Sequence, residues 1–464
     1  MTQQKCISYL SATTAMVELA NSRSQQQAGP TRLTLGVAFL AVLGWTACNP
    51  SLNHASHLED PADPCAIALL SPAGAKSTDW QIQRLQQAAR EGRNRSARLE
   101  HLGWLYVSRA RTRHDAGFYK LADQAAACIE KSDPNSAAAL LLRGHVYQNL
   151  HRFQEAEGAA RRLVTQRESP FDHGLLGDAL MEQGRLDEAA AAYQKMVDLR
   201  PGLESYGRAA HLRWLRGDLE GATALMRLAA RGGGPRNAEP TAWAYSRLAL
   251  YELQSGAFGR ALQAVRNALE LQPEYAPALF AEGRVLLAKG EAAQALEPLS
   301  TAARLNPLLE YQWLLAEALR AAGRLDEALR VESEIERQGG IDDPRTFAVY
   351  LATRDRSVAT AVRLAERELT VRCDVFTYDA LAWSLHAAGE THRANEAMKS
   401  ALSAGTQDAR LFLHAALISA AAGESAEAAR FREKADSLRH LLLPSELERL
   451  KAARKSTAPK ASSS

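Results

Sequence analysis

The apolar residues of this chain fall into helical patterns, and no segment alternates β-branched and polar residues as a strand does. Alanine, leucine, arginine and glutamate are abundant, and most of these residues favour helices. Hydrophobic residues make up 46% of the 464 positions, whereas aromatic residues make up only 6%. The pattern predicts an all-α protein.

A glycine recurs at the places where one predicted helix ends and the next begins. The interval between successive glycines is nearly constant, and it doubles once, between Gly323 and Gly389. Glycine supplies the backbone freedom that ends a helix, so the series predicts tandem helix pairs of nearly constant length. The glycines are Gly184, Gly217, Gly256, Gly290, Gly323, Gly389 and Gly423.

An alanine series runs in register with these glycines, one helical turn or slightly more after most of them. A small side chain there lets the two helices of a pair approach closely. The alanines recur at the same nearly constant interval, which indicates one repeat array rather than several unrelated domains. The alanines are Ala156, Ala189, Ala222, Ala261, Ala295, Ala328, Ala361, Ala394 and Ala428.

The period and its small residues resemble the tetratricopeptide repeat family. In the unit over residues 175–201, the family's signature positions hold Leu176, Gly177, Leu180, Gly184, Leu186, Ala189, Tyr193 and Pro201. Pro273 and Pro307 close two later units. The resemblance implies an all-α solenoid, a right-handed superhelix of about ten helix pairs, with helical caps at 80–91 and 445–454.

We predict four segments along the chain. They are an export or lipoprotein-like signal with a long leader (1–48), a flexible linker (49–79), the solenoid (80–455) and a disordered tail (456–464). In the pair over residues 344–370 the turn glycine is missing, and Arg356 stands in its place. Because the repeats fill most of the chain, no segment remains for a separate catalytic domain.

An uncharged apolar run, from Leu33 to Ala47, precedes Cys48. The run is too short to span a bilayer comfortably, but it is typical of an export signal. Its end resembles the bacterial lipoprotein signal, although Trp45 stands where that family usually has leucine. The resemblance implies that Cys48 is acylated and that the protein is an outer-membrane lipoprotein facing the periplasm. A cleaved signal, an uncleaved anchor, a cytoplasmic protein and a start at Met16 remain alternatives.

Neither the net charge nor the sequence motifs indicate catalysis or nucleic-acid binding. The formal net charge is +3, from 56 basic and 53 acidic residues, so no global field favours nucleic acid. The common motifs of zinc proteases, nucleotide-binding loops and serine hydrolases are absent. We therefore expect no catalytic residue, no cofactor, no nucleic acid and no small-molecule substrate.

The five cysteines form no CxxC pair and no regular spacing, which argues against a disulfide framework and a structural zinc site. His54, His57 and Cys65 lie in the predicted linker, where nothing would pre-organise a metal site. We expect no metal. Whether Cys65, Cys128 and Cys373 form disulfides is left open by their spacing.

In the tetratricopeptide family the first helix of each pair lines a concave groove, and this resemblance implies a set of partner-binding positions. Aromatic rings flanked by charges would hold an extended peptide or a helix. In the alternative, the rings only fill the space between superhelical turns. The positions, counted in register from Ala189, are His211, Trp214, Trp243, Phe280, Arg284, Trp313, Glu317, Arg320, Phe376, Asp379, Trp383 and His386.

The predicted function is a protein-protein interaction scaffold or adaptor, held at the membrane by its N-terminal segment, with a protein or peptide as partner. Two alternatives remain: a non-catalytic subunit that presents substrate in an envelope enzyme complex, and a cytoplasmic tetratricopeptide adaptor.

Overall fold

The computed structural model describes residues 63–70, 79–92, 94–113, 115–341 and 343–456. The predictions for the signal and Cys48, for most of the linker and for nearly all of the tail lie outside these residues. Within them every regular element is a helix, and no helix is both long and apolar enough to span a bilayer. The chain divides into two compact units, with the boundary between Leu142 and Arg143.

The first unit contains α2 (Pro64–Ala68), α3 (Trp80–Arg90), α4 (Arg95–Arg113), α5 (Gly117–Ser132) and the start of α6 (Ala137–Asn149). A disulfide joins Cys65 to Cys128, 63 residues apart, and so ties α2 to α5. Asp63 caps α2 and forms an ion pair with Lys131 at 2.5 Å. Residues 63–70 are therefore packed structure, and the linker prediction is wrong there, because the partner of Cys65 carries no sequence signal.

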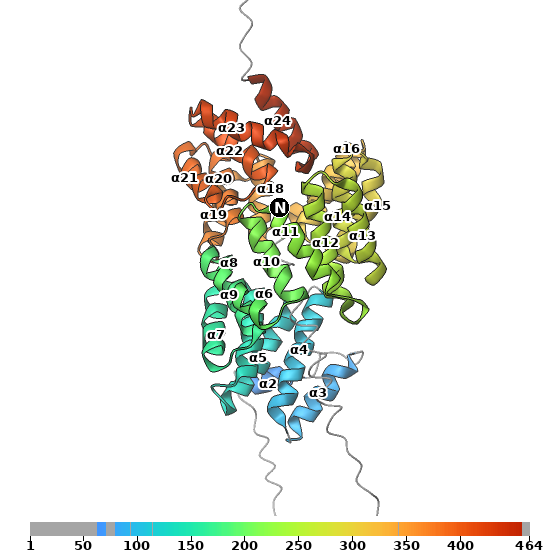
Figure 1. The fold of residues 1–464 in the computed structure, drawn as a ribbon, viewed down its shortest axis with the longest axis vertical. Coiled ribbons are helices and arrows are strands. Elements are labelled where there is room, and N and C mark those ends of the chain that lie inside the picture. Colours follow the sequence, from blue (N-terminus) through green and yellow to red (C-terminus); the bar gives the residue numbers. More distant parts are fainter. Residues whose placement is uncertain (1–62, 71–78, 93, 114, 342, 457–464) are drawn as a thin grey trace, which may run out of the picture. The chain divides into compact units, whose positions relative to one another are not determined.

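The second unit contains the remaining helix pairs (Figure 1). Together with α4 and α5, the described residues form ten helix pairs, which confirms the predicted all-α solenoid. After α6 come α7 (Phe153–Gln166), α8 (Pro170–Glu182), α9 (Leu186–Leu199), α10 (Leu203–Leu215), α11 (Leu219–Arg231), η2 (Pro235–Asn237), α12 (Ala238–Gln254), α13 (Phe258–Leu271), α14 (Ala276–Ala288) and α15 (Ala292–Leu305). The chain continues with α16 (Leu309–Ala321), α17 (Leu325–Gln338), α18 (Pro344–Thr353), α19 (Val358–Leu369), α20 (Val375–Ala387), α21 (Thr391–Leu402), α22 (Ala409–Ala421), α23 (Ser425–Ser437), η3 (Arg439–Leu441) and α24 (Pro444–Ser456).

All seven turn glycines adopt a left-handed backbone, with φ between 74° and 82°, which uses the backbone freedom expected of them. The turn between α18 and α19 has no glycine, and there Asp355 takes this conformation with φ 51°. The repeat register predicts Arg356 in that role, but the turn is one residue longer than the others, and Ser357 also has a positive φ of 45°. Aspartate tolerates the left-handed region better than most residues, since its short side chain can hydrogen-bond locally.

The alanine series packs as predicted. Eight of the nine alanines are completely buried, and Ala428 is nearly so. At Gly177 of α8 the approach is closer still, because a Cβ atom would lie 2.4 Å from Cε1 of Tyr193 on α9. The small residues of the repeat therefore set how closely the two helices of a pair lie.

The second unit also contains contacts between distant repeats. Gln254 of α12 donates from Nε2 to the carbonyl of Gln407 at 2.7 Å, and the Thr406 hydroxyl donates to the carbonyl of Leu215. Arg372 lies 3.3 Å from a carboxylate oxygen of Glu182 on α8. In a simple solenoid each repeat contacts only its neighbours. Here early and late repeats of the unit meet directly.

Candidate functional site

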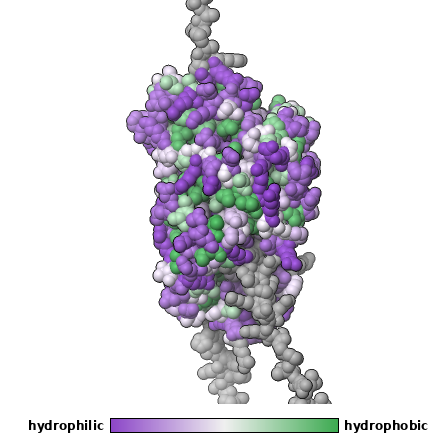
Figure 2. Space-filling model, viewed as in Figure 1, coloured by the Kyte–Doolittle hydropathy of each residue, from purple (hydrophilic) through white to green (hydrophobic). Residues whose placement is uncertain are grey.

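All twelve predicted groove residues lie on the first helices of their pairs. Nine are buried, and Arg284, Arg320 and His386 are partly buried. Figure 2 shows mainly polar residues on the face in view, with smaller hydrophobic patches between them. The burial arises from contacts within the chain, and binding of a partner by these residues stays a prediction.

An aromatic stack joins two of the predicted helices. The ring of Trp214 on α10 stacks against Phe376 on α20, with centroids 6.0 Å apart, and against His211 at 5.5 Å. Its indole nitrogen donates to Oε1 of Gln254 at 2.7 Å. These rings fill the space between sequence-distant repeats.

The tryptophans of α16 and α20 are enclosed in the same manner. Trp313 meets Tyr350 edge-on at 5.4 Å, and the guanidinium of Arg410 lies 4.9 Å from its centroid. Trp383 stacks on His414 at 4.0 Å and donates to the Thr353 hydroxyl at 3.0 Å. A partner that reached either ring would first have to displace these neighbours.

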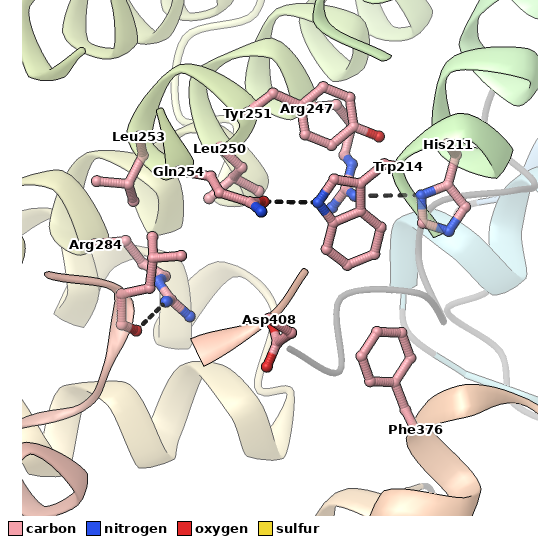
Figure 3. A pocket seen from close by; sticks show the side chains of 11 residues that line it. His211, Trp214, Arg247, Leu250, Tyr251, Leu253, Gln254, Arg284, Phe376 and Asp408 are labelled. Carbon is pink, nitrogen blue, oxygen red and sulfur yellow. Dashed lines mark hydrogen bonds between the residues drawn. The ribbon is translucent and has the colours of Figure 1, made fainter. Parts of the chain in front are cut away.

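Four predicted residues nevertheless converge on one cavity: His211, Trp214, Arg284 and Phe376 (Figure 3). The cavity is small, with a volume of about 50 Å³. The remaining lining residues, which sequence reasoning missed, are Arg247, Leu250, Tyr251, Leu253, Gln254, Asp408 and Leu441. Five of them lie on α12, one helical turn or more beyond the predicted Trp243. Residues spaced by three or four positions from Trp243 share its helix face, and this spacing could have identified some of them.

The cavity combines positive charge with aromatic walls. Burial lowers the pKa of the Arg284 guanidinium, which donates to the carbonyl of Leu441 at 2.7 Å. Burial and the nearby Arg247 hold the pKa of His211 well below its usual value, so its imidazole is neutral at pH 7. Burial raises the pKa of Asp408, which also caps α22. The arrangement suits an acceptor group of a ligand, such as a carbonyl or a carboxylate.

The C-terminal segment, residues 438–456, lies against the first helices α12, α14, α16 and α22, and we call the surface that they present to it the inner face. His440 Nε2 lies 3.0 Å from the carbonyl of Leu253, and Ser445 donates from its amide and hydroxyl to Glu317 at 3.0 and 2.7 Å. Arg449 donates to the carbonyl of Thr353. The predicted cap at 445–454 is therefore more than a cap on the last pair, because α24 contacts α16 as well as α22 and α23.

The described residues contain no group of three or more His, Cys, Asp and Glu side chains that could hold a metal ion. Cys373, the free cysteine of the described part, is exposed.

These features define a helical-repeat solenoid whose inner face is largely filled by its own side chains. The profile of the tetratricopeptide repeat matches residues 141–204, 175–238, 246–310 and 280–341. The chain therefore contains tetratricopeptide repeats, and it folds as an all-α solenoid of that type. Solenoids of this kind are in general non-catalytic scaffolds for protein–protein interaction.

Solved structures that resemble the chain are distant in sequence. A tetratricopeptide repeat protein from Parabacteroides merdae is 16% identical, with coverage of 52% of this chain and 90% of that chain and a TM-score of 0.40. A monomeric mutant of IFIT1 with m7Gppp-AAAA is 13% identical, with coverage of 69% and 76% and a TM-score of 0.45. The APC/C hetero-tetramer Cut9-Hcn1 is 14% identical, with coverage of 80% and 94% and a TM-score of 0.36. At the level of whole sequences, no curated protein matches the chain.

Proposed function

We propose that the protein is an exported interaction scaffold, anchored in the cell envelope, which holds a protein partner on the inner face of its second unit. The observation that carries the partner site is the convergence of residues from α10, α14 and α20 on one cavity. A cavity of about 50 Å³ has room for a small chemical group and not for a length of peptide. The partner would therefore insert a single acceptor group beside Arg284 and make its other contacts around the cavity.

The disulfide supports the proposed location. Disulfides persist in oxidising compartments and are rare in the cytosol. The bond between Cys65 and Cys128 is therefore consistent with export past the inner membrane, as the apolar run before Cys48 predicts.

The partner site is tested by crosslinking in the protein's own host. A photo-crosslinking amino acid in place of Leu250, which lines the cavity, is compared with the same substitution at Leu228 of α11, which is 48% exposed. We expect one polypeptide to be captured from position 250 and not from position 228, with Arg284→Gln reducing its yield. Equal capture from both positions, or no capture from position 250, contradicts the proposed site.

The anchor is tested by intact mass and membrane fractionation, with Cys48→Ser compared against Cys6→Ser as the matched control. Acylation would place a lipid on Cys48 and hold the chain in the membrane fraction. We expect Cys48→Ser to lose the acylated mature N-terminus and to leave the membrane fraction, whereas Cys6→Ser behaves as wild type. A soluble, unprocessed wild-type chain would place the scaffold in the cytoplasm.

A further inference from the structure

The C-terminal segment lies on the inner face as a bound peptide would. Its three leucines make the apolar contact: Leu442 and Leu443 are buried, and Leu441 packs against the cluster of Leu253 and Val285. The backbone of this stretch is also recognised, since Arg284 donates to the carbonyl of Leu441. Apolar anchors combined with main-chain hydrogen bonds are typical of peptide recognition.

An acidic side chain provides the specific polar contact of the segment. Glu446 is only 2% exposed, and it forms an ion pair with Arg410 of α22. Its second oxygen accepts from the amide of Leu443 at 2.9 Å, which caps the start of α24. Arg410 in turn lies over the ring of Trp313. A glutamate in the first turn of a bound helix is thus recognised by a buried arginine on the inner face.

Ser445 precedes this glutamate, and a carboxylate on the inner face binds it. The amide and the hydroxyl of Ser445 both donate to Glu317 of α16, which also accepts from Arg354 at 3.1 Å. Two of the predicted groove residues, Arg284 and Glu317, therefore bind this segment directly, and a third, Trp313, supports Arg410.

The last helix of the segment, α24, is held less extensively than the neighbouring first helix α22. Among the residues of α24 whose burial is described, only Glu446 and Leu450 are buried, whereas α22 buries ten residues. Terminal segments with few buried apolar contacts can open without unfolding the domain. The C-terminal segment can therefore leave the inner face while the repeats remain folded.

We propose that the inner face formed by α12, α14, α16 and α22 is a peptide-binding surface and that residues 438–450 are its intramolecular ligand. A partner with the same pattern binds there by displacing this segment. The pattern is an extended pair of leucines that leads into a helix with serine and glutamate in its first turn. The inference rests on the proposed function in placing the partner on the inner face.

The test uses the full-length protein and a fluorescent peptide of residues 438–456, with binding followed by anisotropy. In the wild type the tethered segment competes at a high effective concentration, so we expect weak binding of the peptide. Glu446→Lys repels Arg410 and frees the surface, and we expect this variant to bind the wild-type peptide about tenfold more tightly. Leu450→Asp weakens the tethered segment without touching Arg410, and it should have the same effect.

The matched control is Glu448→Lys, which makes the same charge change on the same helix at a side chain that is 71% exposed. We expect the control to bind the peptide as weakly as wild type, and a peptide that carries Glu446→Lys to bind no variant. Circular dichroism establishes that each variant is folded. Equal binding by all folded variants, or no binding by either freed variant, overturns the inference.

The two proposals fail in different ways. If the peptide binds the freed variants but no polypeptide is captured from position 250, the peptide-binding surface stands and the proposed partner site is overturned. If crosslinking is as expected but the peptide does not bind, the proposed function stands and the C-terminal segment is not a ligand.

Discussion

A cluster of buried charged side chains connects the late repeats of the second unit, and the repeat motif does not require it. Arg345 and Arg372 are buried, and both lie near Asp374, at 2.6 and 4.0 Å. Burial by itself raises the pKa of Asp374, but the two arginines outweigh it and hold the pKa below its usual value. Such a cluster contributes little net stability as a whole, yet removing one member leaves an uncompensated buried charge.

We expect Asp374→Asn to destabilise the protein by about 3 kcal/mol, because asparagine can still cap α20 but deprives Arg345 of the carboxylate with which it pairs. The measurement is urea unfolding as a function of pH. A depressed folded pKa means that the stabilisation by Asp374 is present above about pH 3.9, the unfolded value, and is lost as pH falls through the folded value. The difference between wild type and variant should therefore shrink on acidification.

The control for this prediction is Asp187→Asn, since Asp187 is 99% exposed and pairs with Arg216 at the surface. We expect a change below about 0.5 kcal/mol, because exposed ion pairs contribute little. A loss as large as that of Asp374→Asn would show that burial is not the cause.

The helix pair is the element that the sequence specifies most completely. Glycines with left-handed φ and buried alanines recur in the pairs that carry the repeat signature, so the fold class and the approximate number of pairs could be predicted. The placement of the twelve candidate residues on first helices could also be predicted, because it follows from register along each helix. The side chains from distant repeats that pack over these residues could not be predicted. Phe376 meets Trp214 although several repeats separate them in the sequence, and no periodic signal records such a contact.

Two elements at the ends of the array were predicted poorly for the same reason. The position of α2 is set by the disulfide from Cys65, and the position of α24 is set by Glu317 and Arg410. Each depends on one or two distant partners rather than on a repeated pattern. Composition therefore predicted a linker for the first, and the place at the end of the repeat array predicted a simple cap for the second.

Close packing within a pair can be tested at two glycines. Gly177→Ala would place its Cβ against the rigid ring of Tyr193, and we expect a loss of about 1–3 kcal/mol. Gly158 lies in the interior of α7, is exposed, and leaves open space around the position of a Cβ atom, so Gly158→Ala should gain about 0.5–1 kcal/mol. Urea midpoints measure both changes, and a common sign would refute the packing argument.

At the scale of the whole molecule, we expect the disulfide between Cys65 and Cys128 to stabilise the first unit and not the second. A loop of 63 residues gains about 4 kcal/mol from such a crosslink in the chain-entropy account. We expect reductant or Cys128→Ser to increase hydrogen exchange in α2 and α5 while exchange in α18 to α22 stays unchanged. Cys373→Ser, which removes the free cysteine, is the control and should change neither region. Faster exchange throughout both units would contradict this confinement.

The contact between Trp214 and Phe376 also bears on how the protein is made. A growing chain completes α10 long before α20 leaves the ribosome, so the ring of Trp214 lacks its contact with Phe376 throughout that interval. Exposed aromatic surface of this kind is what drives aggregation of incomplete chains and engages chaperones. A truncated messenger RNA would therefore yield an aggregation-prone fragment rather than a shorter functional solenoid. The late repeats are needed to cover aromatic residues of the earlier ones.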